Sequence, residues 1–65
     1  MVGLFDIFKL VQNGEPVWLE AAQNLESATA RVQLLQQQSP GDYMIYSHKT
    51  GKKIVFNARG GIRRD

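Results

Sequence analysis

Two pairs of short apolar segments flank one amphipathic segment, and this order constrains the fold more than any other feature of the chain. Each pair is joined by a glycine-containing turn, at residues 12–15 and 49–52. Between the pairs, residues 24–38 have the apolar spacing of a helix. One helix covers only one face of a sheet built from two hairpins. The other face is therefore expected to be solvated, paired with a partner or used for binding.

The four apolar segments have the composition of β-strands. Residues 4–11 and 17–21 are rich in aromatic and β-branched side chains and flank Asn13-Gly14, a sequence typical of a two-residue type I′ hairpin turn. Residues 43–48 and 54–56 form the second pair. Strict alternation along the second strand predicts that Trp18 and Glu20 share a face.

The segment between the hairpins has clear helix boundaries. Asn24 is suited to cap the first turn, and Ser39-Pro40-Gly41 ends the helix because proline disfavours helical geometry in the residue before it. One apolar helix face is formed by Leu25, Ala28, Val32 and Leu35. The predicted fold is α+β, in β-β-α-β-β order. It has a four-stranded, mainly antiparallel sheet with the helix packed on one face.

Charge is distributed unevenly along the chain. Residues 1–48 contain two Lys or Arg and five Asp or Glu, a net charge of −3, whereas residues 49–65 contain six and one, a net charge of +5. We expect one domain at residues 1–58 and a basic, flexible tail at residues 59–65. Basic tails contact nucleic acid or anionic lipid, or simply stay solvated and aid solubility. The sequence leaves both interpretations open.

The chain contains no cysteine, which excludes disulfides and thiolate metal sites. A domain of this size buries only about 60% of the surface that its unfolded chain exposes, and such domains often gain stability from a partner subunit. The cysteine-free composition fits a reducing cytoplasm, where we expect the protein to be located. We expect no membrane partner, because there is neither a signal-peptide pattern nor an apolar stretch near the ~20 residues of a membrane span.

Several short patterns extend over roughly residues 4–56: Trp18-Leu19-Glu20-x-Ala22, then Pro40-Gly41-x-Tyr43-x-Ile45, then Thr50-Gly51. In these the chain resembles a family of short, uncharacterised bacterial proteins. The shared positions are turns, strand positions, the helix cap and the apolar helix face. The resemblance implies a small stand-alone bacterial domain, and it implies no activity, cofactor or catalytic residue.

We expect no catalytic, cofactor-binding or metal site. His48 is the only histidine, and its neighbour Ser47 is predicted to point to the opposite face of the strand, so the two form no nucleophile–base pair. One histidine without cysteine gives no metal-ligand cluster of the usual spacing. The carboxylates are scattered along the chain, and the protein is therefore expected not to be an enzyme.

Aromatic residues occur on every predicted strand. Alternation places Phe5 and Phe8 on opposite faces, and likewise Tyr43 and Tyr46, so the face without the helix receives aromatic side chains unless they fill the core. The main prediction is a protein-interaction module, self-associating as a homodimer or binding a protein partner through the open sheet face or an edge strand.

The alternative is a nucleic-acid-binding domain, which would stack bases on sheet aromatics beside the basic C-terminal segment. Both functions use the same candidate interaction surface: Phe8, Trp18, Tyr46, Lys49, Lys52, Lys53, Arg59, Arg63 and Arg64.

Overall fold

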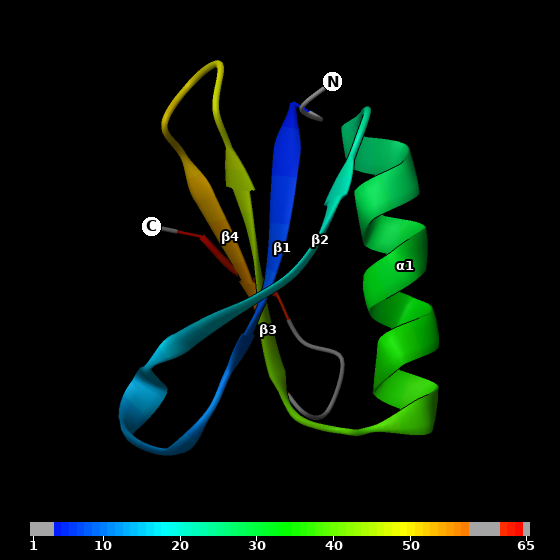
Figure 1. Cartoon of the computed structure of the whole chain (residues 1–65), viewed down its shortest axis with the longest axis vertical. Coiled ribbons are helices and arrows are strands. Elements are labelled where there is room, and N and C mark those ends of the chain that lie inside the picture. Colours follow the sequence, from blue (N-terminus) through cyan, green and yellow to red (C-terminus); the bar gives the residue numbers. More distant parts are fainter. Residues whose placement is uncertain (1–3, 58–61, 65) are drawn as a thin grey trace.

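One antiparallel sheet with a helix on one side makes up the structure, a computed structural model that describes residues 4–57 and 62–64 (Figure 1). The elements are β1 (Phe5–Leu10), the 3₁₀ turn η1 (Gln12–Gly14), β2 (Pro16–Ala22), α1 (Leu25–Gln38), β3 (Asp42–Ser47), β4 (Lys53–Phe56) and β5 (Ile62–Arg64). The strand order is β2-β1-β3-β4-β5. The predicted α+β class, the β-β-α-β-β order and the antiparallel pairing of the first four strands are confirmed.

The C-terminal segment corrects the predicted domain boundary. Ile62 pairs with Phe56 and Arg64 pairs with Ile54, so residues 62–64 form a fifth strand and the prediction of a flexible tail is wrong for them. Without β5, the outer edge of β4 would carry unpaired backbone N–H and C=O groups. Even a short strand of low apolar content therefore gains hydrogen bonds by pairing with that edge. The rest of the predicted tail lies outside the described residues.

The first hairpin turn also differs from the prediction. The Val11 N–H donates to the Glu15 carbonyl and the Gly14 N–H donates to the Val11 carbonyl, each at 2.9 Å, and Gly14 has a φ of 72°. This is a three-residue loop in which a left-handed glycine follows a tight turn, whereas a type I′ hairpin would have a two-residue loop. The glycine is still required, because other residues rarely adopt that φ.

A β-bulge in β2 overturns the predicted alternation of that strand. Phe8 pairs with Trp18 but Ile7 pairs with Glu20, so Leu19 is an extra residue on the β2 side. The bulge separates Trp18 from Glu20, which lies on the helix side of the sheet and binds Arg31 of α1. The prediction that the two share a face is therefore wrong, because alternation fails wherever a strand contains an extra residue.

The core lies between the sheet and α1. Its buried members are Ile7, Ala22, Ala28, Val32, Tyr43, Ile45 and Phe56, with Leu19, Leu35, Phe5 and Ile54 packed against them. The predicted helix face is confirmed at Ala28 and Val32, whereas Leu25 in the first turn stays 42% exposed. The cap is confirmed as well, since the Ser27 N–H donates to Asn24 Oδ1 at 2.8 Å.

Tyr43 ties the sheet to the C-terminal end of the helix. Its ring is buried, and its hydroxyl donates to the Ser39 carbonyl at 2.5 Å, with the Leu35 carbonyl 3.4 Å away. Gln36 makes a parallel link: its amide donates to the Asn57 carbonyl at 2.8 Å and accepts from the Gly41 N–H at 3.1 Å. The Tyr43 hydroxyl gives the Ser39 carbonyl a partner just after the helix, and Gln36 ties the helix to the chain on either side of the sheet strands β3 and β4.

Tyr43→Phe is expected to destabilise the fold by about 1 kcal/mol, because the ring stays in place but the Ser39 carbonyl loses its hydroxyl donor. Urea unfolding followed by circular dichroism measures the difference. Tyr46→Phe is the matched control, since its hydroxyl makes no hydrogen bond within residues 4–57 and 62–64 that would be lost. Equal stability of the two variants would contradict this role for Tyr43.

Candidate interaction surfaces

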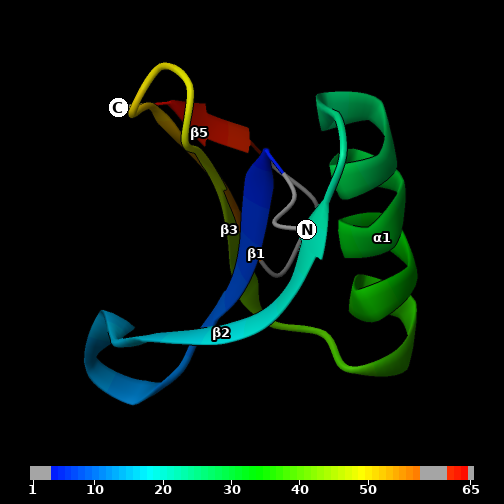
Figure 2. The same cartoon turned by 45° about the horizontal axis from the view of Figure 1, so that its top comes forward.

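The helix covers one side of the sheet and leaves the other uncovered (Figure 2). The pairing register places one apolar set on the uncovered side, in four adjacent strands: Phe8, Leu10, Trp18, Met44, Tyr46 and Val55. We call this set the open face. All of these side chains except Trp18 are half-buried by their neighbours, and Trp18 is 56% exposed.

Trp18 is held in place although it is exposed. Its indole N–H donates to Asp6 Oδ1 at 3.2 Å, and the second carboxylate oxygen of Asp6 lies 2.5 Å from His48 Nε2. The His48 ring contacts the Tyr46 ring edge to face, with centroids 5.3 Å apart. Asp6 on β1 therefore links Trp18 on β2 to His48, the residue after β3. Sequence reasoning missed this role because both partners are distant from Asp6 in the chain.

The predicted interaction residues divide into three groups. Phe8, Trp18 and Tyr46 come together on the open face, and Lys53 pairs with Tyr46 at its margin. Lys49 and Lys52 lie in and just after the turn between β3 and β4. Arg63 and Arg64 belong to β5, and Arg59 lies outside the described residues.

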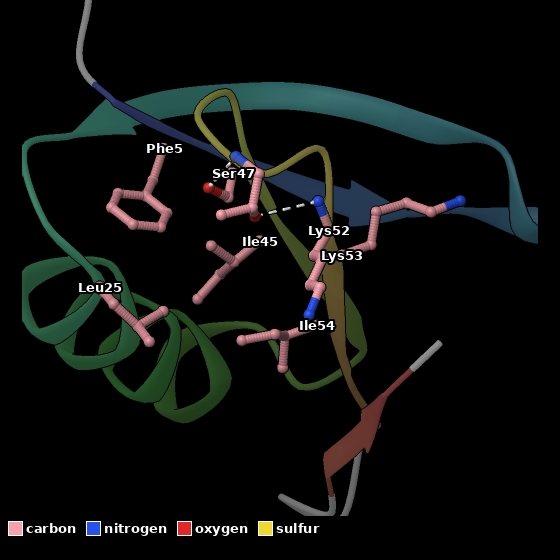
Figure 3. Close-up of a pocket in the computed structure, with 8 residues that line it drawn as sticks. Phe5, Leu25, Ile45, Ser47, Lys52, Lys53 and Ile54 are labelled. Atoms are coloured by element: carbon pink, nitrogen blue, oxygen red, sulfur yellow. Dashed lines mark hydrogen bonds between the residues drawn. The ribbon is translucent and has the colours of Figure 1, made fainter.

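A hollow of about 420 Å³ lies on the other side of the sheet, beside the start of α1 (Figure 3). We call it the helix-side hollow, and its lining residues are Phe5, Leu25, Ile45, Ser47, Thr50, Lys52, Lys53 and Ile54. One sequence signal points to this hollow. Leu25 and Ile54 are apolar residues near the starts of α1 and β4, and one 14-residue helix cannot cover every strand of the sheet.

No group of three or more His, Cys, Asp or Glu side chains within residues 4–57 and 62–64 is placed to hold a metal ion. In the part of the chain that the structure describes, no helix has the length and apolar character needed to cross a bilayer.

The Glu20–Arg31 pair joins β2 to the helix at the protein surface. Arg31 Nε lies 2.8 Å from Glu20 Oε1, and Arg31 Nη2 donates to Glu20 Oε2 at 3.0 Å. This hydrogen bonding lowers the pKa of Glu20 below its usual 4.5, although partial burial opposes the shift, and it raises the pKa of Arg31.

A carboxyl group whose pKa is lowered by folding stabilises the fold above its unfolded pKa, and this contribution is lost as the pH falls through the folded value. Glu20→Gln is therefore expected to lower the thermal unfolding midpoint slightly at pH 7 and to match the parent protein near pH 3. Glu15→Gln, at an exposed loop carboxylate, is the control. A Glu20→Gln deficit that persists unchanged at low pH would contradict the ion-pair explanation.

Comparison of the chain with models of protein families, with curated proteins and with solved structures finds no match. The resemblance to short bacterial proteins therefore stays a prediction from the sequence patterns.

Proposed function

We propose that this protein is a small, non-enzymatic interaction module that self-associates through its open face. The observation that supports the proposal most is the position of Trp18, which is 56% exposed yet bonded to Asp6, and which pairs with Phe8 of the open face. Tryptophan and tyrosine are enriched among the residues that contribute most to protein interfaces. A contiguous exposed apolar patch on a soluble domain commonly marks an interaction site.

A second copy of the chain is the partner that this surface fits best. In a dimer with two-fold symmetry, the same surface of each subunit forms the interface, so one apolar face packs against the identical face of the second copy. Two sheets packed face to face bury both inner faces about 10 Å apart, as in β-sandwiches. A 65-residue domain with one helix over one side of its sheet has much to gain from such burial.

The nucleic-acid alternative has one observation in its favour, since Phe8, Trp18 and Tyr46 share a face as base-stacking residues do. Two carboxylates on that face oppose it. By register, Asp6 and Asp42 lie there as well, and Asp6 is bonded to the exposed indole itself. Negative charge beside the stacking residues repels phosphates, so the open face favours protein over nucleic acid.

Sedimentation velocity across a range of micromolar concentrations tests the proposal. A dimer that forms as the concentration rises is expected, and a monomer at every concentration would exclude self-association. A parallel fluorescence titration with mixed single-stranded RNA and DNA at two salt concentrations tests the alternative. Binding that is strong at low salt and weakens steeply with added salt would favour nucleic acid instead.

Bacterial origin and a cytoplasmic location belong to the same proposal. The sequence resemblance supports the first, and the cysteine-free composition supports the second.

A further inference from the structure

The helix-side hollow has an apolar interior formed by side chains from four elements. Ile45 of β3 is 1% exposed at its base, and Phe5 of β1 and Ile54 of β4 are half-buried beside it. Leu25, the first residue of α1, forms the remaining side and is 42% exposed. Figure 3 shows these four side chains arranged around a common space.

The hollow exists because of where α1 packs. The helix packs mainly on β1, β2 and β3, and the helix-side residue Ile54 lies on the next strand, β4. A recess of about 420 Å³ lies between Leu25, at the start of α1, and Ile54. Small-molecule sites commonly measure ~300–1,000 Å³ and combine an apolar lining with a few polar groups.

The polar groups at the rim of the hollow are all able to donate hydrogen bonds. Ser47 Oγ accepts from the Thr50 N–H and Thr50 Oγ1 accepts from the Lys52 N–H, each at 3.3 Å. These bonds use acceptor sites of the hydroxyls and leave each O–H proton to donate. Residues 49–53 contain three lysines and no acidic residue, and Lys52 lines the hollow on the helix side. Lys53 also borders the hollow, but it pairs with Tyr46, so by register its side chain belongs to the open face. The hydroxyl groups of Ser47 and Thr50 and the ammonium group of Lys52 are together complementary to an anion.

We propose that the helix-side hollow binds a small amphipathic carboxylate, with its aliphatic chain against Phe5, Leu25, Ile45 and Ile54. The carboxylate then lies at the rim formed by Ser47, Thr50 and Lys52. This site is separate from the open face, because it lies on the opposite side of the sheet. It goes beyond the proposed self-association and does not depend on it.

Three probes separate the parts of this proposal in an NMR titration at constant ionic strength: sodium octanoate, neutral 1-octanol and sodium acetate. Octanoate is expected to shift the amide signals of residues 45–54 and to saturate. Octanol is expected to bind about fivefold more weakly than octanoate, because an exposed charge interaction rarely strengthens binding by more than this factor. Acetate, which lacks the aliphatic chain, is expected not to saturate. Octanol binding as tightly as octanoate would overturn the assignment to an anion.

Two lysines of the same turn provide a matched pair of variants. Lys52→Gln is expected to remove the advantage of octanoate over octanol, whereas Lys49→Gln makes the same charge change outside the lining and is expected to preserve it. If both variants lost this advantage equally, octanoate would be attracted by the net charge of the protein and not by a specific site, and the proposal would be overturned.

Leu25→Trp tests the location, because the larger side chain fills the hollow from an exposed helix position where folding tolerates it. It is expected to abolish saturable octanoate binding, while Trp18→Ser on the opposite face leaves it unchanged. Octanoate binding that survives Leu25→Trp, or that shifts the signals of Phe8 and Tyr46 instead, would overturn the proposal.

Discussion

Ile7→Ala is expected to leave the domain largely unfolded under conditions in which the parent protein is folded. Ile7 is fully buried on β1, which pairs with both β2 and β3, and its side chain contributes to the core beneath α1. Removing a buried aliphatic side chain of this size costs ~2–5 kcal/mol through lost burial and the cavity left behind. A core in a domain this small rarely supplies more than ~3–5 kcal/mol in total, so the loss is comparable with the whole stability.

Urea unfolding at fixed protein concentration, followed by circular dichroism, measures this effect. Leu34→Ala is the matched control, because it removes an aliphatic side chain that is 45% exposed on α1. The control is expected to change stability by no more than ~0.5 kcal/mol. An Ile7→Ala protein as stable as the Leu34→Ala protein would contradict the position of the core described above.

Trp18→Ser is expected to weaken dimer formation by about 30-fold or more, the effect of losing a ~2 kcal/mol contact at the centre of an interface. The monomer should tolerate the change, since the indole is 56% exposed and its one hydrogen bond is to the surface carboxylate of Asp6. Sedimentation equilibrium gives the dimer dissociation constant for each variant, and circular dichroism verifies that the variant is folded.

Val17→Ser is the matched control for that experiment. Val17 is the preceding residue on the same strand and is 45% exposed, but it pairs with Lys9 on the helix side of the sheet. It is expected to leave the dissociation constant nearly unchanged. Similar losses in both variants, or no loss in either, would show that the open face is not the contact surface.

The parts of the fold that the sequence predicted depend on neighbouring residues. Asn24 caps the helix because its side chain reaches a backbone N–H three residues away, and the spacing of Ala28 and Val32 follows from one helical repeat. The opposite placement of Tyr43 and Tyr46 likewise follows from alternation in a strand without a bulge.

The parts that the sequence did not predict depend on pairing between distant segments. The bulge at Leu19 shifts the register of β2 against β1, and no local pattern in the sequence specifies it. Strand β5 forms because an edge of β4 is available, although Arg63 and Arg64 give it little strand character of their own.

The candidate surfaces also combine features that the local sequence predicts with features that depend on distant segments. Alternation predicted that Phe5 and Phe8, and likewise Tyr43 and Tyr46, lie on opposite faces, and the register confirms this. Which of them lie on the uncovered face follows only from the position of α1. The bridge from Trp18 through Asp6 to His48 joins residues up to 42 positions apart, so only the folded sheet reveals it. The helix-side hollow depends on where the first turn of α1 lies relative to β4, and this placement depends on packing between segments distant in the chain.

If two copies of this chain meet through the open face, the contact can be observed in an isotope-filtered NOE experiment. The sample is a mixture of labelled and unlabelled protein at a concentration where the dimer forms. We expect intermolecular NOEs between the Trp18 indole and the side chains of Phe8, Tyr46 or Val55. Intermolecular NOEs confined to Leu25, Leu34 and the helix surface, or a protein that stays monomeric at that concentration, would contradict contact through the open face.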